Sequence, residues 1–350
     1  FNTNYHYIVP EVEDDMIMEL SGDKLFAEYK EAKALGIETK PIVVGPYTML
    51  KLCRYTGSKK AADFTDAFVN VYKQIIEKCE TQGALWLQIE EPALVQDMSK
   101  EDIALFHKIY DALLSVSDSC KILLQTYFGD VRDIYKDLIT MPFAGIGLDF
   151  LEGKKTAALV EEYGYPTDKI LFAGLVNGKN IWKNHYDRTL KVIRNLREKD
   201  INVVLSTSCS LLHVPYTLQH ESKLVKEYLE HFAFAEEKLT ELKDLGKLAD
   251  CKDYTKEVEY QKNYVLFEQD RNCNNEAVKS RLAKVTEKDY VRLPERKERQ
   301  KLQKKEFGLP ELPTTTIGSF PQTKDVKANR SAYRKGEITQ EEYVAFNKKK

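Results

Sequence analysis

The sequence lacks long apolar runs, a signal peptide and a strong excess of charge of either sign. Because no apolar stretch is long enough to span a bilayer, no transmembrane segment is predicted. A formal net charge of -2, with 31% of the residues charged, creates no field that would gather nucleic acid or acidic lipid. We therefore expect neither a membrane nor a nucleic acid among the partners of this chain.

Paired cysteine motifs are also missing. The six cysteines are scattered without a C-x-x-C pair, and they are Cys53, Cys79, Cys120, Cys209, Cys251 and Cys273. At this chain length the spacing does not favour a disulfide scaffold, and a reduced, cytoplasmic compartment fits better. A zinc site needs clustered cysteine and histidine ligands, and no cluster with that spacing is present. The residue pattern therefore predicts no metal ligands in this chain.

What the sequence does contain, up to about residue 215, is an alternation of short apolar runs with long amphipathic ones. The expected strands are Tyr5–Val9, Ile42–Gly45, Leu85–Glu90, Ile122–Phe128, Gly145–Phe150, Ile170–Val176 and Val203–Cys209. The expected helices include Asp63–Cys79, Lys100–Ser115, Asp187–Glu198 and Leu218–Leu245. Repeated strand–helix units predict an α/β fold of the (β/α)8 TIM-barrel type. A closed barrel needs one strand more than these, so we expect its first strand to lie upstream of Phe1.

The composition changes after about residue 246. Residues 247–311 are rich in Lys, Glu, Asp and Asn, and the stretch that starts at Lys288 predicts a charged helical connector. Its glutamates alternate with basic residues, which favours a solvated helix face over a nucleic-acid patch. Residues 312–350 open with a strand pattern, as a new domain would. We thus expect an incomplete barrel in residues 1–246, a connector in 247–311 and a truncated second domain in 312–350.

Polar residues follow the expected strands at the edge where a barrel gathers its catalytic groups. Glu90 and Glu91 end one strand, and Asp149 ends another. Because successive side chains point to opposite faces of a strand, at most one of the two glutamates faces the barrel axis. One interpretation makes Glu90 or Glu91 a general base with Asp149 as its partner. The alternative, which we favour from the residues alone, is that these carboxylates fix loops by hydrogen bonds.

Cys209 and His213 form a C-x-x-x-H pattern after the last expected strand. The pattern fits a nucleophile and its base. Pro215 and the apolar pair Leu211-Leu212 indicate a strand exit instead. We therefore favour a buried structural thiol at Cys209.

The sharpest candidate site is Ile317-Gly318-Ser319, where the expected strand near the end of the chain breaks into a loop. Gly318 would let a substrate approach the backbone closely, and Ser319 offers a hydroxyl and an amide to a carboxylate or an amine. On chemistry alone, an ordinary strand-to-loop turn is the better interpretation.

Several stretches, in one order along the chain, resemble the cobalamin-independent methionine synthase family. They are FNTNYHYIVPE at Phe1, GPYTMLKL at Gly45, QIEEPALVQD at Gln88, SCSLLHVP at Ser208 and TTTIGSFPQT at Thr314. The first four resemble the N-terminal barrel of that family, and the last resembles the first strand and loop of its C-terminal barrel. The resemblance therefore spans nearly the whole chain.

This resemblance implies a two-barrel methyltransferase. Such proteins move a methyl group from 5-methyltetrahydropteroyltri-L-glutamate to homocysteine, and a zinc ion holds the homocysteine thiol as a thiolate. In the family, Ile317, Gly318 and Ser319 would contact the amino-acid end of homocysteine. The zinc ligands would lie beyond Lys350, so no catalytic or metal-binding residue is assigned here. We expect this chain to be inactive by itself, with a scaffolding role and one wall of the folate cleft.

Two alternatives remain open from the sequence. One is a stand-alone barrel enzyme that uses Glu90, Asp149 and Cys209. The other is a noncatalytic barrel that serves as a docking or assembly module.

Overall fold

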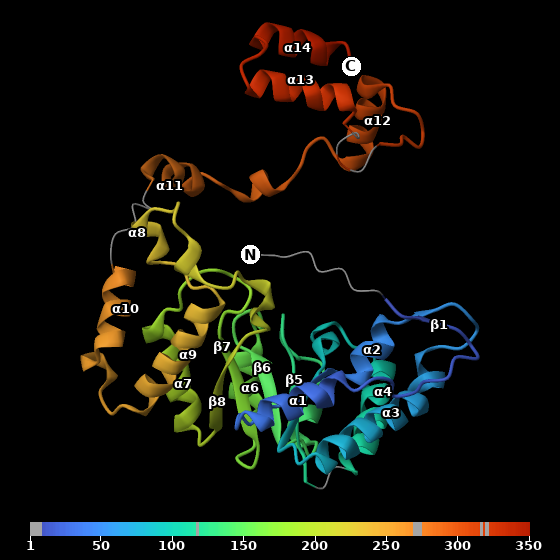
Figure 1. The fold of residues 1–350 in the computed structure, drawn as a ribbon, viewed down its shortest axis with the longest axis vertical. Coiled ribbons are helices and arrows are strands. Elements are labelled where there is room, and N and C mark those ends of the chain that lie inside the picture. Colours follow the sequence, from blue (N-terminus) through green and yellow to red (C-terminus); the bar gives the residue numbers. More distant parts are fainter. Residues whose placement is uncertain (1–8, 117–118, 269–274, 316–317, 319–321) are drawn as a thin grey trace. The chain divides into compact units, whose positions relative to one another are not determined.

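The computed structural model describes residues 9–116, 119–268, 275–315, 318 and 322–350 (Figure 1). The chain divides into two compact units, Phe1–Gln269 and Asp270–Lys350. The predicted domain boundaries after residues 246 and 311 stay predictions.

The first unit is built on a six-stranded, fully parallel sheet with the order β2-β4-β5-β6-β7-β8. The strands are β2 (Ile42–Val44), β4 (Trp86–Glu90), β5 (Lys121–Gln125), β6 (Gly145–Asp149), β7 (Ile170–Val176) and β8 (Asn202–Thr207). The register places Glu90 opposite Gln125 and Asp149 opposite Gly174. The carboxyl ends of the strands therefore meet at one edge. Six of the expected strands are confirmed.

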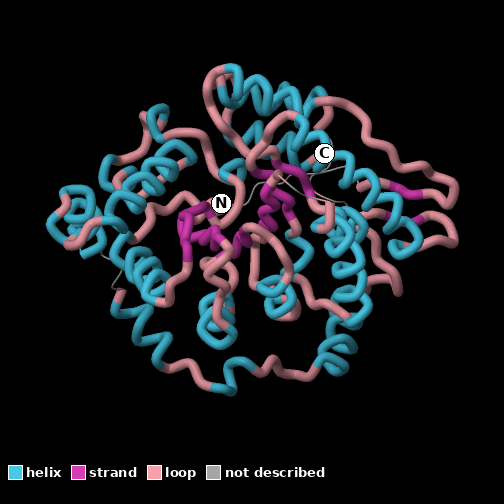
Figure 2. The backbone as a smooth tube through the Cα atoms, turned by 90° about the horizontal axis from the view of Figure 1, so that it is seen from below, coloured by secondary structure: helices cyan, strands magenta, loops and turns pink. Residues whose placement is uncertain are grey.

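Helices follow the strands and lie outside the sheet (Figure 2). They are α1 (Lys24–Ala34), α2 (Pro46–Leu52), α3 (Ala61–Thr81), α4 (Lys100–Leu114), α5 (Tyr135–Thr140), α6 (Thr156–Tyr163), α7 (Tyr186–Glu198), α8 (Lys226–Leu229), α9 (Ala235–Asp250) and α10 (Val258–Glu268). Two short strands, β1 (Glu11–Val12) and β3 (Arg54–Tyr55), form a separate parallel pair. In α3, Phe64, Phe68 and Tyr72 recur every fourth residue and are buried, as in an amphipathic helix.

The sheet curves strongly around its concave face. The rings of Trp86 on β4 and Phe172 on β7 lie 5.7 Å apart, although β5 and β6 separate their strands. On a flat sheet these strands would be about 14 Å apart, because neighbouring strands lie about 4.8 Å from one another. Gly145 on β6 leaves the room for Phe172, since a Cβ atom there would lie 2.8 Å from its ring. This curvature resembles a segment of a barrel wall.

The expected closed barrel is not confirmed, because the sheet of the described residues is open. Its edge strands are β2 and β8. Ile42, Val44 and Val204 on these edges are at least 39% exposed, whereas a closed barrel would bury such side chains in its interior. The expected strand at Tyr5–Val9 falls almost entirely outside the described residues.

The continuous helix expected at Leu218–Leu245 is wrong. A single 3-10 turn covers Leu218–His220, α8 follows, and α9 begins only at Ala235. Between the helices, Phe232 forms an antiparallel bridge with Trp182. Tertiary contact to the loop after β7 therefore overrides the local helical pattern.

The second unit is helical in the part that the structure describes. Its helices are α11 (Glu276–Ala283), α12 (Arg296–Phe307), α13 (Lys324–Arg334) and α14 (Gln340–Lys348). The charged helix expected after Lys288 is confirmed as α12, which begins eight residues later than that stretch. The rings of Tyr333 and Tyr343 stack 4.7 Å apart between α13 and α14. Across the described ranges of both units, no helix is long and apolar enough to cross a membrane.

Candidate functional site at the carboxyl edge of the sheet

Glu90 lies at the end of β4 on the concave face of the sheet. Its Oε1 accepts a hydrogen bond from the Gln88 side chain at 3.0 Å, and its Oε2 accepts one from the Tyr127 hydroxyl at 3.1 Å. Gln88 is two residues earlier on β4, so its side chain lies on the same face as that of Glu90. Both carboxylate oxygens are thus engaged by neighbours at the mouth of the sheet.

Glu91 points the other way, into the helical layer. Its carboxylate accepts hydrogen bonds from the amides of Tyr47 and Thr48 at 3.0 and 2.7 Å, and from the Tyr110 hydroxyl at 2.6 Å. Burial of this fully enclosed carboxyl raises its pKa to about 7. A substrate has no access to a side chain that is 0% exposed. Glu91 therefore fixes the start of α2 rather than acting as an exposed base.

Asp149 is also a loop-holding group in this structure. Its Oδ2 accepts from the Phe128 amide at 3.0 Å, and its Oδ1 accepts from the amides of Leu151 and Glu152 at 2.8 and 2.9 Å. Burial raises the pKa of the Asp149 carboxyl, against the effect of these three amides. Phe128 has a φ of 73°, which a non-glycine residue rarely adopts, so Asp149 stabilises an unfavourable turn.

Cys209 is a buried thiol. Its Sγ lies 3.8 Å from the carbonyl oxygen of Ser210, to which it donates, and burial raises its pKa to about 11. The thiolate is the reactive form of cysteine, so a raised pKa removes most nucleophilic character at neutral pH. The His213 ring packs edge-to-face against Phe128, with 5.4 Å between the ring centroids. These contacts favour the structural role expected for Cys209.

A further pair of charged residues joins the loops of the carboxyl edge. Lys179, after β7, lies 3.8 Å from a carboxylate oxygen of Glu152, after β6, and its ammonium sits 5.5 Å from the centre of the Phe128 ring. The side-chain oxygen of Asn177 accepts hydrogen bonds from the backbone amides of Lys179 and Asn180, and these bonds hold the turn that contains Lys179. Sequence reasoning did not single out Lys179. Its place directly after a buried strand could have identified it.

The structure brings Glu90, Asp149 and Cys209 to the carboxyl edge but engages each with its own local partners. Of the predicted homocysteine-contacting residues, Ile317 and Ser319 lie outside the described residues. Gly318 has a φ of +83°, and a Cβ atom there would meet nothing within 4 Å. This left-handed conformation favours glycine.

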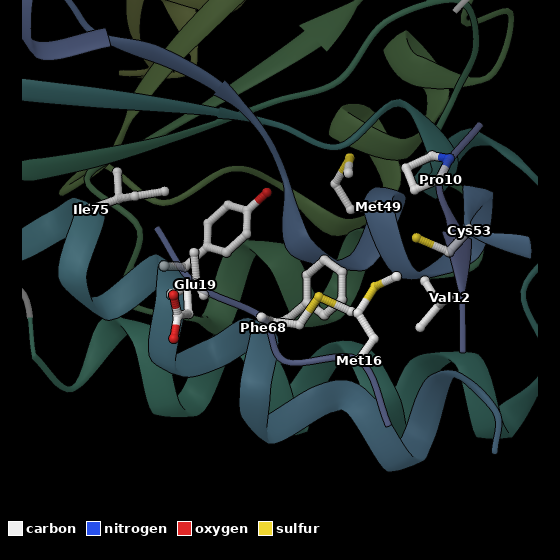
Figure 3. Close-up of a pocket in the computed structure, with 11 residues that line it drawn as sticks. Pro10, Val12, Met16, Glu19, Met49, Cys53, Phe68 and Ile75 are labelled. Carbon is white, nitrogen blue, oxygen red and sulfur yellow. The ribbon is translucent and has the colours of Figure 1, made fainter. Parts of the chain in front are cut away.

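No group of three or more His, Cys, Asp or Glu side chains within the described ranges is placed to hold a metal ion. A separate cavity of about 270 Å³ lies between the segment after residue 9, α2 and α3 (Figure 3). Its lining is apolar apart from Glu19, Cys53 and Tyr72, and includes Met16 and Met49. It shares no residue with the carboxyl edge and brings together no acid–base set.

Two family models match this chain. Residues 1–200 match the N-terminal domain of cobalamin-independent synthase, and residues 312–350 match the catalytic domain of cobalamin-independent synthase. The first match alone covers more than half of the chain. The order of the two matches is the order that the sequence motifs indicated.

Curated relatives are similar along the entire chain. A 5-methyltetrahydropteroyltriglutamate–homocysteine methyltransferase of Campylobacter jejuni subsp. doylei is 48% identical over 350 residues, which is 100% of this chain and 46% of the relative. One of the same name from Streptococcus suis is 50% identical over 348 residues, covering 99% of this chain and 46% of the relative. The chain thus spans about half the length of the curated relatives it matches.

Among solved structures, one named as a vitamin-B12 independent methionine synthase from Listeria monocytogenes aligns with a TM-score of 0.50 at 12% identity. The alignment covers 68% of this chain and 72% of that one, and it supports a shared fold only. Together with the domain matches and the identity to the curated relatives, the motifs show that this chain belongs to the cobalamin-independent methionine synthase family.

Proposed function

We propose that this chain serves, as part of a longer protein, in the transfer of a methyl group from 5-methyltetrahydropteroyltri-L-glutamate to homocysteine, which yields methionine. The observation that carries the proposal is the 48% identity that runs through all 350 residues to a curated methyltransferase of that name. Since the chain spans only 46% of that relative, we assign the activity to the longer protein and expect residues 1–350 alone to be inactive.

In this proposal the first unit is a scaffold and one wall of the folate cleft. Its curved parallel sheet, with Trp86 and Phe172 in contact across the concave face, is consistent with part of a (β/α)8 barrel. The longer protein would supply the strands that cover the β2 and β8 edges. Glu90 and Asp149 would keep the loops of the carboxyl edge in place, because their oxygens already bind neighbouring groups.

The segment Ile317-Gly318-Ser319 is proposed to contact the amino-acid end of homocysteine. The positive φ of Gly318 favours glycine, and the lack of a side chain there supports close approach of a ligand to the backbone. The Ser319 hydroxyl could accept from the substrate ammonium or donate to its carboxylate.

Zinc enters this proposal through the family alone. Bound zinc would keep the homocysteine thiol ionised and nucleophilic at neutral pH. The described side chains do not gather into a ligand set for it. On the family resemblance, we propose that the zinc ligands lie in the longer protein, beyond Lys350.

The test is the variant Ser319→Ala in the longer protein. Loss of one hydroxyl that binds a charged substrate group should raise the KM for homocysteine about tenfold, because such a hydrogen bond contributes roughly 1.5 kcal/mol or more. Ser331→Ala, an exposed serine on α13, is the matched control and should leave the KM unchanged. An unchanged KM in Ser319→Ala would contradict the assigned contact.

A second experiment, which compares turnover by the isolated chain and by the longer protein, distinguishes the proposal from the two alternatives. If the 350-residue chain were a stand-alone enzyme, Asp149→Asn and Cys209→Ala would abolish its turnover. If it were only a docking module, the longer protein would show no methyl transfer at all. The proposal requires turnover in the longer protein and none in the isolated chain.

A further inference from the structure

Two buried charged side chains on α9 hold the loop between β7 and α7. Lys238 is 0% exposed and its Nζ donates to the carbonyl oxygen of Trp182 at 3.1 Å. Glu241, one turn later and 3% exposed, accepts the amide of Asn184 through Oε1 at 2.7 Å. Charged side chains are almost never fully buried unless they are paired or hydrogen-bonded, because removing them from water is costly.

The loop is held at further points around the same place. Asn184 donates through Nδ2 to the Leu175 carbonyl at 2.8 Å, and its own carbonyl accepts from Asn263 of α10 at 2.9 Å. The Ala233 amide donates to the Ile181 carbonyl at 2.8 Å. The earlier part of this loop carries Asn177 and Lys179, which lie at the carboxyl edge of the sheet. Whatever holds Asn184 therefore also limits how Lys179 can move.

The hydrogen bonding of the Glu241 carboxylate is incomplete in this arrangement. Its Oε2 is buried and has no hydrogen-bond partner in the part of the chain that the structure describes. An ionised carboxylate with a buried, unpaired oxygen is unfavourable, whereas a protonated carboxyl carries no net charge to solvate. The surroundings of Glu241 thus favour its protonated form over its ionised form.

We propose that the protonation state of Glu241 controls opening of the β7–α7 loop. The neutral carboxyl group holds the loop closed, and the loop opens more often once the carboxyl group is ionised. Through that loop Glu241 acts as a positioning residue for Asn177 and Lys179 at the carboxyl edge. This goes beyond the proposed methyl transfer and does not depend on it.

The direction of the effect follows from linkage. Burial raises the pKa of Glu241 from 4.5 to about 7, against the attraction of Lys238 and Lys183. When the loop opens, the carboxyl reaches water and its pKa returns towards 4.5, so opening releases a proton between these values. Opening therefore becomes more frequent as pH rises towards about 7, and levels off above it.

The other charged groups near Glu241 affect the pH dependence of loop opening in ways that differ from the effect of Glu241 itself. Asp244, on the same helix, raises the pKa of Glu241 further and accepts from the Tyr186 hydroxyl at 3.0 Å. Burial lowers the pKa of His185 in the loop, so its contribution has the opposite sign and favours opening as pH falls. Burial also lowers the pKa of Lys238, which lies near Glu241 and Cys209.

The test is amide hydrogen exchange of the loop in the intact chain, followed by mass spectrometry of peptides covering residues 179–186. Protection factors, corrected for intrinsic exchange, should fall by about twentyfold between pH 5.5 and 7.5. Glu241→Gln, a neutral isostere of the protonated group, should stay protected at both pH values. Glu236→Gln, the control on the same helix, should behave like the parent.

Two further variants sharpen the result. Lys238→Met removes a charge that lowers the pKa of Glu241, so the fall in protection should move to higher pH. Trp86→Phe leaves Trp182 as the single tryptophan of the two in the chain, and its fluorescence should then report the same transition. Protection that does not change with pH in the folded parent, or that changes equally in Glu241→Gln, would overturn the proposal.

Discussion

The first unit holds a large core of buried side chains, whereas in the second unit no described side chain is buried. Phe106 and Tyr110 of the first unit are 0% exposed and pack against each other, with ring centroids 4.5 Å apart. The helices of the second unit rely on caps, ion pairs and the stacking of Tyr333 on Tyr343. Because buried apolar area supplies most folding free energy, stability should reside in the first unit. Sequence similarity to the family, in contrast, extends into both.

The strongest test of this comparison is truncation of a ring in each unit. Phe106→Ala should destabilise the first unit by about 3–5 kcal/mol, because it removes a fully buried ring and leaves a cavity. Phe307→Ala, at a ring of α12 that is 63% exposed, should change stability by less than about 0.5 kcal/mol. Urea unfolding of both variants measures the difference. Equal losses would mean that the second unit has a core of its own.

The pH dependence of unfolding should differ in sign between the units. The pKa of Glu91 in the first unit is raised to about 7, so stability is highest below about pH 4.5 and falls by about 3 kcal/mol as pH rises to 7. In the second unit, hydrogen bonds from Lys350 and Thr323 lower the pKa of Asp325 to about 2, and stabilisation is lost only as pH falls towards that value.

Denaturant unfolding from pH 4.5 to 8, read by tryptophan fluorescence, follows the first unit, since Trp86 and Trp182 both lie there. Glu91→Gln should reduce the slope without abolishing it, because Glu241 contributes in the same direction. A slope that survives unchanged in Glu91→Gln would exclude Glu91 as a source of it.

Replacing a glycine by alanine should lower the stability of the two units by different amounts, because the surroundings of the added methyl group differ. A Cβ atom on Gly153 would lie 2.2 Å from the backbone oxygen of Asp149, so Gly153→Ala should cost about 1–3 kcal/mol by overpacking. Gly308 ends α12 with a φ of +55° and has no atom within 4 Å of such a Cβ. Gly308→Ala should cost only the backbone strain of about 1 kcal/mol, confined to the end of α12. Thermal unfolding of the first unit should therefore respond to Gly153→Ala alone.

The smallest expected effect concerns the α13–α14 pair. Tyr343→Ala removes the stacked ring and should loosen this pair by about 1 kcal/mol. Hydrogen exchange should accelerate in residues 324–348 and remain unchanged in residues 9–268. Acceleration in both would show that the two units do not unfold independently.

The sequence predicted the strands better than the surroundings of the site. Buried strands such as Gly145–Asp149 and Ile170–Val176 can be recognised from their apolar composition, because both faces of a parallel strand are covered. The alternation rule also separated Glu90 from Glu91. It could not say that Glu91 would meet Tyr110 of α4, since that contact depends on how α4 packs.

The wrong helix at Leu218–Leu245 and the missed role of Glu241 share a physical cause, which is contact between residues that are distant along the chain. The helix expected at Leu218–Leu245 is broken because Phe232 forms a bridge with Trp182 and the Glu237 carboxylate binds the Leu218 amide, 19 residues away. The same applies to Glu241, whose partner Asn184 is 57 residues away. No local pattern reveals such partners.

The proposed function assigns methyl transfer to a longer protein, in which residues 1–350 would be a stable scaffold. The most direct measurement is methionine formation from homocysteine and 5-methyltetrahydropteroyltri-L-glutamate, with zinc present, by the 350-residue chain and by the longer protein side by side. We expect turnover by the longer protein only. Turnover by the 350-residue chain alone, lost in Asp149→Asn, would contradict the proposed function.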